Sequence, residues 1–482
     1  MSGLVKLAEL SRLGRSPQLP MTLQLPVGEL KVSEWLRVLP GRRYVARAAW
    51  RDRPVLAKLL VGGKAHRHFR RERSGVTCLK ERQIDTPELL ASDYRAGEGG
   101  WLLFAFLDGA ESLGQKWLAV AAEPSSVSRQ QEILEMAARA IGSLHARGVW
   151  QEDLHLDNLL CRDNRLYWID GDSVRATRTT TSLPVSLAAD NLGLFLAQLP
   201  TACDAWTPHL LVAYTQAGGT VGMSLDVLQR AVAKQRRRRL HDYLAKTGRE
   251  CSLFSARRSS RQLLVVCRDQ VEILGPLLAD PDRYIEAGVL LKKGGSATVA
   301  RVELNGRSLL VKRYNIKGVR HWLRRFWRPS RAWHAWREGH RLRFLGLATP
   351  RPLAVLEQRC CWLRRRAYLV TDYLDGPNLV ERMASLSDDH ALTTELTALH
   401  RLFDALCRER ISHGDLKGSN LIRDGEHWAL IDLDAMRQHR SAWLFRRACR
   451  RDRSRLLRNW SAESPLYRRL DALLPPVDDS TH

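Results

Sequence analysis

The 482-residue sequence contains two copies of one unit, and this duplication constrains the fold more than any other feature. A shift of 262 residues aligns 151–175 with 413–437, and eight of the 25 paired positions are identical. A shift of 254 residues aligns an earlier pair of segments and matches Lys58 with Lys312. Because the repeat is long and occurs twice, it indicates two similar domains and not a solenoid, which needs a short period repeated several times.

Each copy has the pattern of strands followed by helices. Apolar and polar residues alternate around the lysine in Val55–Lys58 and in Leu309–Lys312, which predicts strands. Apolar residues recur at three- and four-residue spacing in 131–145 and in 391–406, which predicts helices. The expected fold class is therefore α+β, with a strand-rich lobe before a helical lobe in each copy.

The segment His413–Asn420 has the spacing H-x-D-x-x-x-x-N, and Asp432 follows at the end of an apolar run. Phosphoryl transfer needs a carboxylate beside the attacking hydroxyl and oxygen ligands for Mg²⁺ held against the triphosphate. Asp415 is the candidate base, and Asn420 and Asp432 are the candidate magnesium ligands. Lys417 can face the transferring phosphate. The equivalent residues of the first copy, with the same seventeen residues between the two aspartates, are Asp153, Asn158 and Asp170.

Residues upstream of this segment are candidates for contacts with ATP. Lys312 is the candidate ligand of the α- and β-phosphates, and Glu338 is the helix carboxylate expected to pair with it. The turn Gly294-Gly295-Ser296 permits close approach of backbone amides to phosphate. The stretch Tyr368–Gly376 is the candidate strand and hinge for the adenine base. The corresponding lysine and glutamate of the first copy are Lys58 and Glu72.

These motifs resemble the lipopolysaccharide kinase family, the bacterial Kdo and heptose kinases, which are distant relatives of protein kinases. The resemblance covers nearly the whole chain, twice, and implies two tandem bilobal kinase-like domains. It implies an ATP- and Mg²⁺-dependent phosphotransferase with an alcohol group as acceptor. The implied acceptors are sugar hydroxyls of the lipopolysaccharide inner core, at the cytoplasmic face of the inner membrane of Gram-negative bacteria. Twelve additional residues between Lys312 and Glu338, basic and aromatic, resemble a feature of relatives that act on a membrane-held substrate.

The residues after the candidate metal-binding aspartates depart from the protein-kinase pattern. Leu433-Asp434 and Gly171-Asp172 replace the expected phenylalanine and glycine. Twenty residues separate Asp432 from Asp452, where a helix is expected to resume, so little room is left for a peptide-docking activation segment. A sugar is therefore expected as the acceptor in preference to a protein.

The first copy is the more degenerate of the two. It has Gln151-Glu152 in place of His413-Gly414, and its glycine loop is reduced to Gly41. Glu152 is expected to place a negative charge beside the base, so both an active domain and a pseudokinase scaffold remain open. We also expect Asp190 and Asp452 to bind the backbone of the catalytic loop in each copy. The join is expected near Ser252, which gives domains 1–251 and 252–482, the second being the main catalytic domain.

The formal charge of +25, in a chain with 44% hydrophobic residues, indicates a folded protein with an anionic partner. Arginine and aromatic residues are concentrated in 236–239, 313–337 and 440–458, and suit an anionic membrane surface or nucleic acid. We favour the membrane surface, and an RNA- or protein-directed kinase-like protein is the alternative. The nine cysteines form no C-x-x-C pair, which favours a reduced cytoplasmic protein without structural metal. No secretion signal or membrane span is recognisable, so the expected location is peripheral.

Overall fold

The structure, a computed structural model, describes residues 4–121, 123, 127–315, 330–360, 363–386 and 388–474. Its contacts divide the chain into two compact units, Met1–Arg237 and Arg238–His482, which we call unit 1 and unit 2. The division falls inside helix α6 (Leu225–Lys246), which contains the arginine run. The units therefore separate before the join expected near Ser252.

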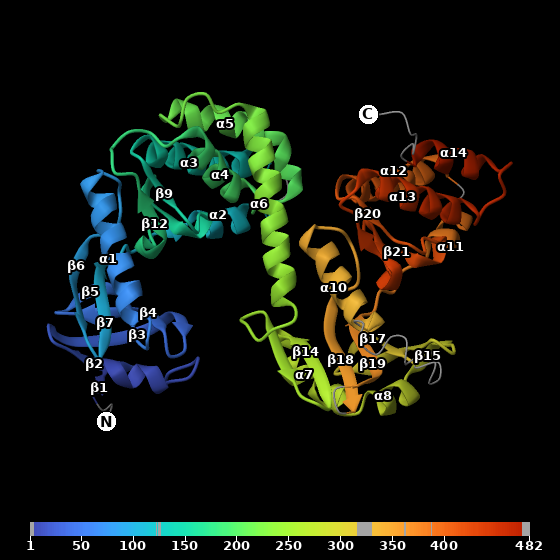
Figure 1. Cartoon of the computed structure of the whole chain (residues 1–482), viewed down its shortest axis with the longest axis horizontal. Coiled ribbons are helices and arrows are strands. Elements are labelled where there is room, and N and C mark those ends of the chain that lie inside the picture. The colour runs from blue at the N-terminus through green and yellow to red at the C-terminus, as the bar shows by residue number, and fades with distance from the viewer. Residues whose placement is uncertain are drawn as a thin grey trace. The chain divides into compact units, whose positions relative to one another are not determined.

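The N-lobe of unit 1 is built on a sheet with the strand order β1-β2-β3-β4-β5-β7-β6 among the described residues (Figure 1). Side chains alternate along β4 as its sequence predicts, because Tyr44, Ala46 and Ala48 are buried and the residues between them are not. The strands are β1 (Val5–Lys6), β2 (Met21–Leu25), β3 (Gly28–Leu39), β4 (Arg43–Trp50), β5 (Arg53–Leu60), β6 (Leu89–Arg95) and β7 (Gly99–Ala105), and a 3₁₀ turn, η1, spans Leu7–Arg12.

Helix α1 (Ala65–Glu81) packs on this sheet through Phe69 and Val76, which share one face at helical spacing. Glu72 lies on the same buried face, so its carboxylate needs a partner inside the protein. Gly75 allows the helix to approach the C-lobe closely, because a Cβ there would lie 2.0 Å from the carbonyl oxygen of Gly171.

The C-lobe of unit 1 is mainly helical and has its own hydrophobic core. Short strands and 3₁₀ turns between its helices carry the catalytic-loop residues. The helices are α2 (Leu113–Ala121), α3 (Val127–Ala146), α4 (Val185–Leu196), α5 (Thr207–Gln216) and the first part of α6; the strands are β8 (Glu111–Ser112), β9 (Val149–Gln151), β10 (Leu159–Arg162), β11 (Arg165–Trp168) and β12 (Val174–Ala176); the 3₁₀ turns are η2 (Leu156–Asn158), η3 (Gly171–Ser173) and η4 (Thr201–Trp206).

The N-lobe of unit 2 repeats this plan with the strand order β13-β14-β18-β19-β17-β16-β15 among the described residues. The predicted strand around Lys312 is β17, paired with β16 on one side and β19 on the other. The strands are β13 (Phe254–Arg258), β14 (Gln262–Cys267), β15 (Val289–Lys293), β16 (Ala297–Leu304), β17 (Arg307–Tyr314), β18 (Pro352–Cys360) and β19 (Leu363–Asp372); the helices are α7 (Val271–Ala279), α8 (Pro281–Ala287) and α10 (Arg331–Phe344), with η5 at Arg268–Gln270.

The C-lobe of unit 2 is helical, and the predicted helix 391–406 lies within α12 (Asp389–Arg408). Asp388 caps this helix by accepting a 2.9 Å hydrogen bond from the Ala391 amide. Each unit thus has a strand-rich and a helical lobe, which confirms the α+β prediction. The remaining elements are α11 (Leu379–Ala384), α13 (Ala442–Leu457), α14 (Pro465–Leu473), β20 (Ile411–Ser412), β21 (Leu421–Asp424), β22 (His427–Leu430), β23 (Arg437–Gln438), η6 (Gly418–Asn420) and η7 (Leu433–Ala435).

One part of the expected aromatic surface is a core element. Trp336 is fully buried on α10, and its indole N–H donates a 3.0 Å hydrogen bond to the carbonyl of Thr247. The interpretation of Trp336 as a surface residue was wrong, because it lies on the buried side of its helix. Trp322, Phe326 and Trp327 lie outside the described residues. In the ranges that are described, no helix is both long and apolar enough to cross a membrane.

Candidate active site

A cavity of about 470 Å³ in unit 2 is lined by residues of both lobes. Lys312 lines it from β17, Asn420 from the last position of η6, and Asp432 from the position just before η7. Tyr373, Leu374 and Gly376 line it just after β19, where the sequence predicted the hinge. The structure therefore brings the predicted phosphate, metal and adenine residues of the second copy to one cavity.

The predicted glycine turn also lies at this cavity. Gly294 follows β15, and its amide donates a 3.1 Å hydrogen bond to the carbonyl of Ala297. This bond closes the turn that contains Gly295 and Ser296. The Asn315 side chain donates to the Gly294 carbonyl at 3.2 Å, and Ser296 lines the cavity. The turn is thus fixed at the position where backbone amides could meet phosphate.

Backbone and side-chain bonds hold the catalytic loop of unit 2 in place. The imidazole of His413 donates through Nε2 to the carbonyl of Ile431 at 2.9 Å. Asp452 accepts from the backbone amides of His413 and Gly414, at 2.7 and 3.0 Å, which confirms its predicted structural role. The side-chain amide of Asn420 donates to the Asp415 carbonyl at 2.8 Å, which ties the candidate metal ligand to the candidate base.

The carboxylate of Asp415 lies between two cations. Lys417 Nζ lies 3.0 Å from Oδ2, and Arg455 Nη1 lies 3.3 Å from Oδ1. Arg455 also donates to the Gly414 carbonyl. The sequence prediction included Lys417 but treated Arg455 only as part of a basic tail, because no motif links it to the catalytic loop.

Lys312 pairs with two aspartates. Its Nζ lies 2.5 Å from Asp432 Oδ1 and 3.0 Å from Asp434 Oδ2. Burial opposes ionisation of Asp432, but the Lys312 ammonium outweighs it and holds the pKa of this carboxyl below its usual value. Burial, and then the Asp434 carboxylate, raise the pKa of Tyr314, whose hydroxyl donates to Asp434 at 2.6 Å. Asp434 is therefore part of the site, although in sequence it was only a departure from the kinase pattern.

The expected pair of Lys312 and Glu338 is not formed. Glu338 instead binds Arg341, whose Nε lies 2.8 Å from Oε2, one turn further along α10. An arginine on the same helix needs no movement of the lobes to reach the carboxylate, whereas Lys312 is held by Asp432 and Asp434. The prediction was wrong for this pairing, since sequence order does not show which of two cations the carboxylate meets.

The equivalent pair is formed in unit 1. Lys58 Nζ donates to Glu72 Oε1, and the Glu72 side chain is only 1% exposed. The Glu72 carboxylate also accepts from the backbone amides of Gly171 and Asp172, both at 3.1 Å. In the copy that the sequence marks as degenerate, the lysine and glutamate are therefore joined as predicted.

Gln151 takes the structural place of the missing histidine. Its amide nitrogen donates to the Ile169 carbonyl at 2.7 Å, as His413 does to Ile431, and its oxygen accepts from Asn158 at 3.2 Å. Asn158 also donates to the Asp153 carbonyl at 2.6 Å, as Asn420 does in unit 2. The loop of unit 1 thus keeps its shape, although the Asp153 side chain is 79% exposed.

In unit 1 the charge of Glu152 is balanced by arginines, and the expected role of Asp190 was wrong. The charge of Glu152 is paired with Arg71 at 3.0 Å and Arg175 at 2.6 Å, so it does not act on the base unopposed. Asp190 pairs with Lys234 at 2.7 Å. Its neighbour Asn191 contacts the catalytic loop instead, through a 2.7 Å bond to the Gln151 carbonyl. Asn191 is itself held at 3.0 Å by the buried His145.

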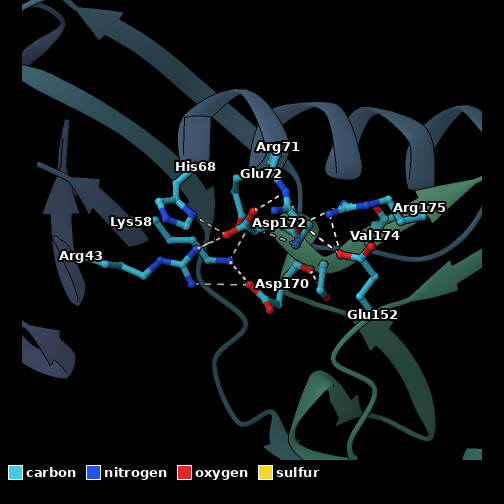
Figure 2. Close-up of polar contacts among 12 residues, drawn as sticks. Arg43, Lys58, His68, Arg71, Glu72, Glu152, Asp170, Asp172, Val174 and Arg175 are labelled. Atoms are coloured by element: carbon cyan, nitrogen blue, oxygen red, sulfur yellow. Dashed lines mark hydrogen bonds and ion pairs between the residues drawn. The ribbon is translucent and has the colours of Figure 1, made fainter. Parts of the chain in front are cut away.

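Asp172 is at the centre of a cluster of basic residues in unit 1 (Figure 2). Arg43 Nη2 lies 3.0 Å, His68 Nδ1 2.7 Å and Arg71 Nε 3.0 Å from its carboxylate. The sequence prediction missed this cluster, but a signal was present, because the motif D-x-D occurs at the aligned positions of both copies.

The residues of unit 2 fit a magnesium ion bound together with a nucleotide. The amide nitrogen of Asn420 is used by the Asp415 carbonyl, which leaves the amide oxygen as a ligand, and Asp432 supplies a carboxylate beside it in the cavity. In the described part of the chain no group of three or more His, Cys, Asp or Glu residues could hold a metal ion. Mg²⁺ needs only one or two protein oxygens when phosphates and water complete its shell.

Comparison with known proteins identifies the family. The model of the "Lipopolysaccharide kinase (Kdo/WaaP) family" matches residues 64–179 and 288–471, together more than half of the chain. No curated protein matches the sequence. A solved structure, "WaaP in complex with acyl carrier protein", is 17% identical over 43% of this chain and 88% of its own, with a TM-score of 0.34 that is too low to support an argument. On the two family matches, the chain belongs to the lipopolysaccharide kinase (Kdo/WaaP) family.

Proposed function

We propose that the chain uses ATP and Mg²⁺ to phosphorylate a heptose or Kdo hydroxyl of the lipopolysaccharide inner core. The cavity of unit 2 carries this proposal, because Lys312, Asn420 and Asp432 line it together. The family membership supports a lipopolysaccharide kinase, and the choice of sugar and of hydroxyl is part of the proposal.

In the proposed reaction, Asp415 orients the acceptor hydroxyl and accepts its proton while the hydroxyl oxygen bonds to the γ-phosphorus and ADP leaves. Lys312 exchanges its aspartate partners for the α- and β-phosphates when the nucleotide binds. Asn420 and Asp432 would hold Mg²⁺, which supplies charge neutralisation for the phosphates. Lys417 and Arg455 flank Asp415 and stabilise negative charge near the transferred group.

We assign the main catalytic role to unit 2 and give Lys58, Glu72, Asp153, Asn158 and Asp170 the corresponding positions in unit 1. The short path between Asp432 and helix α13 supports a sugar acceptor. Only η7 and the two-residue strand β23 lie between them, which leaves no room for a long peptide-docking segment.

We propose that the protein acts at the cytoplasmic face of the inner membrane as a peripheral protein. Trp443 and Leu444, at the start of the arginine-rich helix α13, are 55% and 51% exposed. The guanidinium of Arg447 lies 5.8 Å from the centre of the Trp443 ring. An exposed tryptophan among arginines supports contact with anionic head groups.

Incubation of the purified protein with labelled ATP and dephosphorylated core oligosaccharide tests the function. We expect label on a core sugar, and mapping of the product would identify the hydroxyl. The Asp415→Asn variant is the matched control. Transfer of label to RNA or protein, with none to any glycan, would refute the proposal.

A further inference from the structure

A second cation reaches the candidate metal ligand of unit 1. Arg43 is the first residue of β4, and its side chain is only 15% exposed. Its Nη1 lies 3.6 Å from Asp170 Oδ1, and Lys58 Nζ lies 4.0 Å from the same oxygen (Figure 2). A carboxylate oxygen that would be expected to bind Mg²⁺ thus faces two cations of the N-lobe.

Unit 2 has no such arginine at the aligned position. The shift of 254 residues that matches Lys58 with Lys312 places Ala297 at the position of Arg43. Ala297 lines the cavity, so a small side chain stands there beside the candidate metal site. The two copies therefore differ at this position by a whole guanidinium group.

Arg43 makes Asp170 unsuited to a divalent ion. Mg²⁺ would have to approach the oxygen of Asp170 to about 2.0–2.1 Å, close to a charge that cannot be removed by deprotonation. Arg43 is also fixed by its 3.0 Å bond to Asp172. The cations Arg43, Lys58 and Arg71 lie against the carboxylates of Glu72, Asp170 and Asp172, so the negative charge that would attract the metal is already paired.

We propose that Arg43 takes the place of the divalent cation in unit 1, and that unit 1 binds a nucleoside triphosphate through Arg43 and Lys58 without metal. The inference rests on the proposed function, in which both copies have an ATP site. The 3.6 Å separation of Nη1 from Asp170 is longer than a hydrogen bond, so the N–H groups of Nη1 remain available for a phosphate oxygen. Arginine is well suited to such a bridge because its donors form a planar fork.

Equilibrium binding of labelled ATP to the full-length protein, in excess EDTA and in excess Mg²⁺, tests the inference. We expect about one equivalent of ATP to bind in EDTA. Arg43→Ala should weaken this metal-free binding about 10- to 100-fold, the effect of losing a charge-assisted bond to phosphate. Arg47→Ala is the matched control, because Arg47 lies on the same strand and pairs with Asp108 on the surface. It should bind ATP as the wild type does.

Arg43→Lys keeps the charge without the fork and should weaken metal-free binding by less than Arg43→Ala. This variant provides the test if Arg43→Ala does not fold. The inference is overturned if the wild type binds no ATP in EDTA, or if Arg43→Ala binds it as tightly as the wild type. Binding only in Mg²⁺ would refute this inference alone, whereas no binding in either condition would also refute the proposed function.

Discussion

The carboxylate of Glu72 is expected to contribute several kcal/mol to the stability of unit 1. It is 1% exposed, forms hydrogen bonds with the Lys58 ammonium and the backbone amides of Gly171 and Asp172, and lies 3.9 Å from Arg43. Glu72→Gln keeps the shape but has one acceptor oxygen, so an amide N–H₂ faces a donor. Lys58, 10% exposed, loses its nearest counter-charge and keeps only Asp170 at 4.0 Å. Breaking a buried ion pair from one side costs about 3–5 kcal/mol.

Native-state hydrogen exchange measured on peptides of α1 can test this value, because it reports the opening of one element in a protein with two units. The free energy of opening should fall by about 3–5 kcal/mol in Glu72→Gln. Glu338→Gln is the matched control in unit 2, where Arg341 on the same helix is the partner. Its effect on α10 should be smaller, because both hydrogen bonds of Glu338 go to one cation on the same helix.

A loss below about 1 kcal/mol in Glu72→Gln, the size of an ordinary hydrogen bond, would refute this reasoning. So would a larger loss in Glu338→Gln, because the count of partners would then not determine the cost. Thermal unfolding of the whole chain is less informative, since two units need not unfold in one transition.

Three further predictions concern activity, pH and membrane binding. Asp415→Asn should lower kcat about 10²- to 10⁴-fold while ATP binding is retained. Asp153→Asn should lower kcat less on the same acceptor, and a larger loss in Asp153→Asn than in Asp415→Asn would refute the assignment to unit 2. Burial lowers the pKa of His340 from 6.5 to about 3, so the unfolded chain takes up a proton first. Unit 2 should therefore lose about 1.4 kcal/mol per pH unit between about pH 6 and pH 3. The free energy of unfolding of unit 2, measured by denaturant titration against pH, should show this slope, and His340→Gln should flatten it. The fraction of the protein that sediments with anionic vesicles should fall when salt is added, and it should be lower for Trp443→Ala than for the wild type. Stronger binding to RNA of matched charge would contradict the membrane proposal.

The elements and the catalytic loop could be predicted from sequence because their signals are local or repeated. Hydrophobic periodicity predicts the helix that contains 391–406 and the strand around Lys312, and both are present in the structure. The motif from His413 to Asn420 occurs twice with the same later aspartate. Repetition gave this motif a weight that a single short pattern would not have.

The burial of Trp336 could have been predicted from the same period. Ala332, Ala335, Trp336, Gly339 and His340 lie at helical spacing and are buried on α10. The basic residues between them are typical of a surface segment, but they lie on the other side of the helix from the buried residues. The partner of Glu338, in contrast, could not be predicted from spacing. Arg341 and Lys312 are both cations, and only their positions in space determine which of them binds the Glu338 carboxylate.

In each copy the lysine could pair with the helix glutamate or with the two aspartates of the D-x-D motif. Two sequence differences explain why the lysines of the two units have different partners. In unit 1, Arg43 occupies the aspartates, and Gly75, three residues after Glu72, offers no side chain to compete for Glu72. Lys58 therefore pairs with Glu72.

In unit 2 both positions carry a different residue. Ala297 replaces the arginine of the strand, so Lys312 turns to Asp432 and Asp434, and Arg341 stands at the position of Gly75 and takes Glu338. Arg341→Gly alone should therefore disturb unit 2, because it leaves the buried Glu338 carboxylate without its cation.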